Sequence, residues 1–141
     1  MFDLKYEDRL QSWSCLRQDL EQSKDPIQDV IDFYKSAPHV SIHTDPWDET
    51  RWPNPWELVF ENQYDEFCTV LGQCYSLQLT DRFKGSRFEI HIGVDSKKSR
   101  TYYLLIIDKS TVLGWSESYV DIHVLPKTYQ SQKIYVMPSL Q

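Results

Sequence analysis

The first part of the chain carries apolar side chains at the spacing of amphipathic helices. Between residues 6 and 22, large apolar residues recur at steps of three, three and four, with polar residues between them: Leu10, Trp13, Leu16 and Leu20. One stripe of this kind predicts a helix that buries a single face. Asp25 and Pro26 then supply a cap and a first-turn residue, so the pattern predicts a second, shorter helix that ends near Ser36.

A proline-rich segment follows the second predicted helix. Residues 40–44 alternate between polar and apolar side chains and predict a short strand. Residues 45–55 hold three prolines and two tryptophans, a composition that predicts a stiff, ordered loop. We therefore expect no domain boundary in this segment.

The start of a third helix is marked by its capping residues. Asn54 is the expected cap, Pro55 takes the first helical position, and Glu57 stands three residues after the cap, where its carboxylate can bond back. Apolar residues continue at helical spacing as far as Leu77. This is the longest predicted helix, with an expected break at residues 62–63.

After Gly85 the apolar period changes from 3.6 to 2, which indicates a sheet. Alternation over 88–94 is followed, at intervals of about ten residues, by four further predicted strands: 101–107, 111–115, 119–125 and 133–137. The strand 101–107 is apolar on both faces, so we expect it at the centre, covered on one side by the long helix. The predicted fold is α+β, with N-terminal helices and one long helix packed on a four- to five-stranded antiparallel meander. We expect a single domain over 1–141, mainly helical over 1–80 and a sheet over 86–138.

Composition and charge exclude several classes of protein. The net charge is −6, which argues against nucleic-acid and anionic-membrane partners, because both are bound through clustered lysine and arginine. No apolar run is long enough to cross a bilayer. The three cysteines form no CxxC pair and indicate reduced thiols. We expect a cytoplasmic protein without a metal or a cofactor.

Three segments resemble the core of the transglutaminase-like and papain-like cysteine enzymes. They are NQYDEFCTVLG, FEIHIGV and YYLLIID, which together span residues 62–108, a third of the chain. In that family a helix with a cysteine precedes a strand with a histidine and a strand that ends in an acid. The resemblance implies Cys68 as nucleophile, His91 as base and Asp108 as the residue that orients the base.

The spacing of these residues supports one part of the resemblance and weakens another. A two-residue turn at Lys98 and Ser99 would pair His91 with Ile106 and place Asp108 diagonally from His91 on the same face. The family nucleophile, however, lies in the first turn of its helix, a turn before Cys68. Here the thiol falls in an apolar helical stripe, where burial would raise its pKa and make it inert. The chain is then either a degenerate copy of the fold or a helix and hairpin without this kinship.

Aromatic and basic residues indicate a second kind of site, for a protein partner. Trp47, Trp52 and Trp56 lie within ten positions, and tryptophan is enriched among residues that dominate interface energetics. They either anchor a partner or clamp the proline-rich loop onto the sheet. Residues 82–109 carry seven basic and three acidic side chains, a net +4 that leaves −10 for the remainder. The hairpin residues Lys97, Lys98 and Arg100 are therefore candidates for contacting an acidic partner, which includes a second copy of the chain, or else form a solvated rim.

Two functional hypotheses follow. The first is a non-enzymatic protein, interacting with a partner or with itself, on an inactive transglutaminase-like scaffold. The phrases PWELVFENQY and FEIHI are also similar to uncharacterised proteins of tailed cyanophages, which implies a virion structural or accessory protein in the virion or the host cytoplasm. The second hypothesis is a thiol-dependent hydrolase or acyltransferase that uses Cys68, His91 and Asp108.

Overall fold

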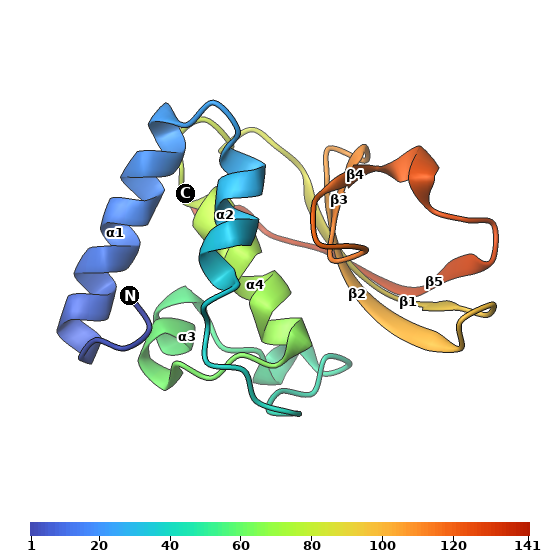
Figure 1. The fold of residues 1–141 in the computed structure, drawn as a ribbon, viewed down its shortest axis with the longest axis horizontal. Helices are drawn as coiled ribbons and strands as arrows, with labels where there is room; N and C mark the ends of the chain where they lie inside the picture. Colours follow the sequence, from blue (N-terminus) through green and yellow to red (C-terminus); the bar gives the residue numbers. More distant parts are fainter.

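The computed structural model describes all 141 residues, and Figure 1 shows helices gathered at one end of the molecule and a sheet at the other. The class is α+β, as predicted. The four α-helices are α1 (Tyr6–Gln22), α2 (Pro26–Tyr34), α3 (Pro55–Glu61) and α4 (Glu66–Gln78). The five strands are β1 (Phe88–Asp95), β2 (Arg100–Ile107), β3 (Thr111–Leu113), β4 (Val120–Asp121) and β5 (Tyr129–Val136). Two short 3₁₀ helices, η1 (Glu49–Arg51) and η2 (Ile122–Val124), complete the elements.

The predicted start of α3 and the predicted break after it are both confirmed. The Asn54 side chain accepts a hydrogen bond from the backbone N–H of Glu57, whose carboxylate accepts one from the backbone N–H of Asn54. This reciprocal pair satisfies two N–H groups that the first turn leaves free. Asn62 then adopts a left-handed conformation, with φ of 53°, and ends α3. The chain restarts as α4 at Glu66, capped by Asp65.

The strand order in the sheet is β4-β3-β2-β1-β5, and every pairing is antiparallel. Strands β1 to β4 form a meander, with β2 in the centre as expected. The last strand departs from a meander, because β5 returns across the sheet to pair with β1. The sheet thus has one very short edge, β4, and one eight-residue edge, β5.

The helices and one face of the sheet share the main hydrophobic core. Helix α4 packs against α1, α2 and α3 and also contacts β2, so it lies between the other helices and the sheet (Figure 1). A buried hydrogen-bond network ties three helices together: Ser76 on α4 accepts from the Trp13 indole at 2.9 Å and bonds the Tyr34 hydroxyl at 3.1 Å. The opposite face of the sheet has a smaller core of four buried residues: Tyr102, Leu104, Ile106 and Val112.

Three predicted strands are shorter or absent in the structure, and one of them, 111–115, ends at Leu113. Residues 40–44 form no strand, and the only β-contact in that region is the isolated bridge between His39 and Tyr64. The predicted strand 119–125 is reduced to Val120–Asp121, after which the chain turns into η2. None of the helices has both the length and the apolar character that crossing a membrane requires.

Candidate functional site

The turn between β1 and β2 sets a register that separates His91 from Asp108. Asp95 pairs with Arg100, so four residues form the turn where two were predicted. His91 consequently lies opposite Leu104, and the predicted pairing with Ile106 is wrong. Asp108 follows the end of β2, where its carboxylate accepts a hydrogen bond from the backbone N–H of Arg87 at 2.8 Å. The carboxylate of Asp108 thus closes the far end of the β1–β2 ladder and does not orient His91.

Cys68 and His91 lie on opposite faces of the sheet. Cys68 is 0% exposed in the main core, which also contains Ile90, the neighbour of His91 on β1. His91 projects to the other face, because neighbouring residues on a strand alternate and its cross-strand partner Leu104 belongs to the second core. Burial raises the pKa of the Cys68 thiol to about 12, and its Sγ donates to the Thr44 hydroxyl at 3.3 Å. The structure therefore does not assemble Cys68, His91 and Asp108 into one site.

His91 belongs instead to a hydrogen-bonded chain on the outer face of the sheet. Its Nδ1 lies 2.8 Å from the Ser131 hydroxyl on β5, and its Nε2 lies 3.4 Å from the Glu89 carboxylate. Arg87 pairs with the same carboxylate at 3.1 Å. Desolvation lowers the pKa of His91, although Glu89 opposes this effect. The alternation along β1 could have predicted that Glu89 lies beside His91. The contact of His91 with Ser131 depends on the pairing of β5 with β1, which no local pattern in the sequence indicates.

The three candidate tryptophans have separate environments. Trp52 is half-buried and clamps the proline-rich loop, with ring centroids 4.9 Å from Phe67 on α4 and 4.7 Å from Tyr135 on β5. Trp56 is 50% exposed on α3 and meets Trp13 edge to face. Trp47 is 52% exposed and lines a hollow beside the start of α4. Of the two roles that the sequence allowed for the tryptophans, partner anchor or loop clamp, Trp52 thus has the second.

Of the three basic candidates at the hairpin, only Arg100 reaches the start of α4. The Arg100 guanidinium lies over the Tyr102 ring at 4.6 Å and 3.9 Å from the Glu66 carboxylate. Lys98 lies over the Trp115 ring at 5.5 Å. Lys97 is exposed in the turn, where its backbone N–H donates to Asp95. Arg100 therefore connects the basic end of the sheet to the first turn of α4.

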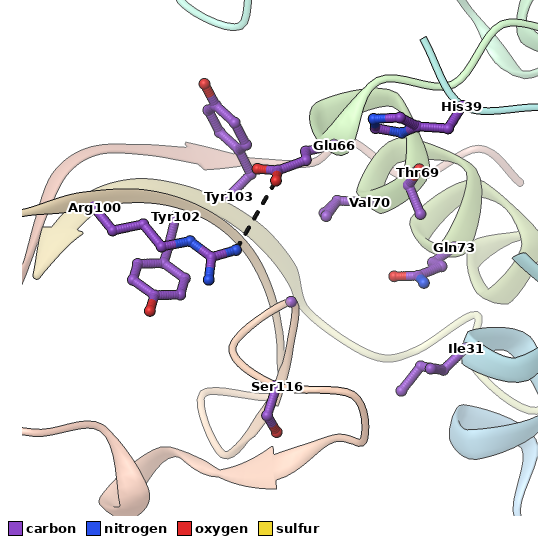
Figure 2. A pocket seen from close by; sticks show the side chains of 11 residues that line it. Ile31, His39, Glu66, Thr69, Val70, Gln73, Arg100, Tyr102, Tyr103 and Ser116 are labelled. Carbon is purple, nitrogen blue, oxygen red and sulfur yellow. Dashed lines mark ion pairs between the residues drawn. The ribbon is translucent and has the colours of Figure 1, made fainter. Parts of the chain in front are cut away.

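Two adjoining cavities at the start of α4 form what we call the α4 groove. The first, of about 240 Å³, lies between α4, α2, the start of β2 and the loop after β3, as Figure 2 shows. The second, of about 280 Å³, lies between α4 and the loop that carries Trp47. His39, Glu66 and Tyr103 line both cavities, so the two adjoin. Trp47 and Arg100, which are far apart in the sequence, thus line adjoining cavities of the α4 groove.

Asp65 holds the loop that carries Trp47 in place, and this loop forms one wall of the α4 groove, the loop wall. One carboxylate oxygen caps α4 by accepting from the backbone N–H of Cys68 at 2.6 Å. The other accepts from the backbone N–H groups of His43 and Thr44 at 2.9 and 3.0 Å. Burial opposes ionisation of Asp65, but these three donors outweigh it, and the pKa is lowered. No sequence pattern singled out Asp65, because its second role depends on the fold of the preceding loop.

A comparison of the sequence with protein-family models and with curated proteins finds no match. The geometry of the α4 groove and of the residues around it therefore carries the functional argument.

Proposed function

We propose that this chain is a non-enzymatic protein-binding protein and that the α4 groove receives its partner, either another protein or a second copy of the chain. The observation that carries the proposal is that Trp47 and Arg100 line two adjoining cavities at the start of α4. Tryptophan and arginine are the residue types most enriched among those that dominate binding energy. The viral setting implied by the resemblance to phage proteins is part of the proposal, with a viral or host protein as partner.

The chemistry of the α4 groove suits a protein surface. Trp47 and the neighbouring Ile42, which is 87% exposed, offer apolar area that a partner would remove from water. Arg100 is held over Tyr102, so its side chain loses less freedom on binding than a free arginine would. A pairing of apolar anchors with one oriented charge is typical of the centre of a protein interface.

One observation favours the thiol-enzyme hypothesis, because α4 begins at Glu66 and Cys68 lies in its first turn, but the burial of the thiol and the position of His91 oppose it. A buried thiol with a raised pKa gives little thiolate at neutral pH, and thiolate is the nucleophile in such enzymes. The imidazole that would act as base projects from the other face of the sheet. We therefore place binding ahead of catalysis.

Selection from a random peptide library, with the purified chain as bait, tests the proposal. Peptides recovered with the wild type should bind Trp47→Ala and Arg100→Ala at least about tenfold more weakly. Trp56→Ala is the matched control, because Trp56 is as exposed as Trp47 but lies on α3 against α1. Equal binding to all variants, or recovery of no peptide, would refute the proposal.

A further inference from the structure

Gln73 is a buried polar residue that makes no hydrogen bond through its side chain, and it borders the first cavity of the α4 groove. Nine polar or charged residues are buried: Thr44, Asp65, Gln73, Ser76, Gln78, Thr80, Glu89, His91 and Asp95. Eight of them make hydrogen bonds through their side chains. Gln73 makes none, although it is only 7% exposed. Four polar atoms are fully buried without a partner, on Arg17, Trp52, Asn62 and Tyr64, but none of these residues lines the cavity. The Gln73 amide is not among them, so its atoms stay accessible from the cavity and can bond a ligand there.

The surroundings of Gln73 direct its amide into the cavity. Glu66, Val70 and Gln73 follow one another at helical spacing, so they form one stripe of α4 that faces β2. Figure 2 shows the Gln73 side chain pointing from α4 into the space between the helix and the sheet. Ile31 lies below it and Ser116 stands across the cavity. The amide keeps both its N–H donors and its carbonyl acceptor free for a ligand.

The lining of the cavity disfavours a charged ligand group. The two formal charges, on Glu66 and Arg100, neutralise each other at one end, where both side chains are more than half exposed. Deeper in, the polar lining consists of neutral groups such as Gln73 and Thr69, beside the apolar Ile31 and Val70. A charge placed among neutral groups loses hydration that these groups do not replace. A neutral group with both a donor and an acceptor can instead form hydrogen bonds with them.

We infer that the first cavity of the α4 groove receives the side-chain carboxamide of an asparagine or glutamine from the partner, paired with the carboxamide of Gln73. Two such groups can exchange two N–H···O hydrogen bonds, which satisfies the unpaired amide. About 240 Å³ is less than the roughly 300–1,000 Å³ of sites that enclose a whole small molecule, so the cavity suits one side chain. A backbone amide would bring its two flanking residues with it, whereas a side chain enters from a single attachment point. This inference rests on the proposed function and names the anchor that the partner would supply.

Amide-resolved NMR titration with blocked amino acids tests the inference. The probes are glutamine, glutamate and methionine, each with acetyl and methylamide ends, so that they differ only in the side chain. The Gln73 side-chain NH₂ signals are identified by their loss in Gln73→Met, a variant that keeps the shape and removes the amide. The backbone spectrum of that variant reports whether the fold is kept.

The expected result is a saturable shift of the Gln73 NH₂ signals with blocked glutamine. Its affinity should exceed that of the glutamate and methionine probes by roughly five- to hundredfold, the effect of pairing a buried polar group. Saturable binding should also disappear in Gln73→Met. The inference is overturned if the methionine or glutamate probe binds as tightly, if blocked glutamine gives no saturable shift, or if Gln73→Met binds it unchanged.

The same variant separates this inference from the proposed function. If library-selected peptides lose affinity with Trp47→Ala but keep it with Gln73→Met, the α4 groove binds a partner and the carboxamide anchor is wrong. If neither substitution weakens those peptides, the proposed function itself fails.

Discussion

The Arg100 guanidinium lies 3.9 Å from the Glu66 carboxylate, and this pair joins the start of β2 to the first turn of α4 (Figure 2). The distance is at the limit for an ion pair, and both side chains are more than half exposed. Pairs of this kind contribute little to stability because water and salt screen them. Either charge can therefore turn to a partner at small cost, while the cation–π contact with Tyr102 keeps Arg100 oriented.

Thiol chemistry separates the three cysteines. Cys15 is exposed, whereas Cys68 and Cys74 are buried in the core and burial raises the pKa of both thiols. We expect iodoacetamide to label the native protein at Cys15 alone and to label all three cysteines after denaturation, as peptide mass spectrometry would show. Stoichiometric labelling of Cys68 in the native protein would restore the enzyme hypothesis.

The two buried glutamines of α4 provide a matched pair for stability measurements. The Gln78 amide donates to the carbonyl of Pro138 at 3.0 Å, whereas Gln73 has no partner. In urea unfolding, Gln78→Met should lower the free energy of unfolding by about 1 kcal/mol or more, because a hydrogen bond is lost and a carbonyl is left unpaired. Gln73→Met should change it by less than about 0.5 kcal/mol or increase it. A similar loss in both variants would mean that Gln73 is paired within the fold.

Asp65 makes the stability of the loop wall depend on pH. Asp65→Asn keeps an oxygen for one donor but sets an NH₂ group against others, and should cost about 2 kcal/mol at neutral pH. Because the folded-state pKa is lowered, this contribution is complete above the ordinary aspartate pKa of about 3.9 and is lost as the pH falls towards the folded value. The difference between wild type and variant should therefore shrink in acid.

A second capping aspartate serves as the control for this measurement. Asp25 caps α2 from an exposed position, so Asp25→Asn should change the free energy of unfolding by less than about 0.5 kcal/mol. If the cost of Asp65→Asn stays constant from neutral pH to pH values below the aspartate range, the role given to the Asp65 carboxylate is wrong.

His91 should titrate below the ordinary histidine value of about 6.5. Burial on the sheet face favours the neutral ring, and Glu89 recovers only part of that effect. Since the unfolded chain then binds a proton more readily, the contribution of His91 to stability is complete above about pH 6.5 and falls as the pH drops below it. The pH dependence of the His91 ring signals in NMR spectra gives the pKa directly, and a value of 6.5 or higher would contradict the described burial.

Local signals in the sequence predicted the elements whose cause is local. The capping pair Asn54 and Glu57 specified the start of α3, and the change of apolar period after Gly85 specified the sheet. The β1–β2 turn was wrong because a two-residue turn normally relies on Gly or Asn, and the chain instead forms a longer turn in which Ser99 takes a positive φ of 51°. The predicted register therefore placed Asp108 two residue pairs closer to His91 than the structure does, and this produced the apparent match between them.

Local sequence patterns could not predict the contacts between segments that are far apart in the chain. The composition of β5 does not indicate which strand it pairs with, and the structure pairs it with β1. The pattern of residues 40–44 predicted a strand, but Asp65 accepts hydrogen bonds from the backbone N–H groups of His43 and Thr44, which are then not available to a sheet. Gln73 gave no signal, because α4 is buried nearly all round and the cavity beside Gln73 depends on how α4 packs against the sheet.

The location of a bound, library-selected peptide on the protein tests the central claim most directly. With isotope-labelled protein, the account predicts that intermolecular NOEs and the largest shift changes fall on the Trp47 indole, Tyr103 and the first turns of α4. The exposed rings of Trp56 and Phe60 on α3 should be unaffected. A peptide that binds on α3, or on the outer face of the sheet around His91, would contradict the assignment of the α4 groove as the binding site.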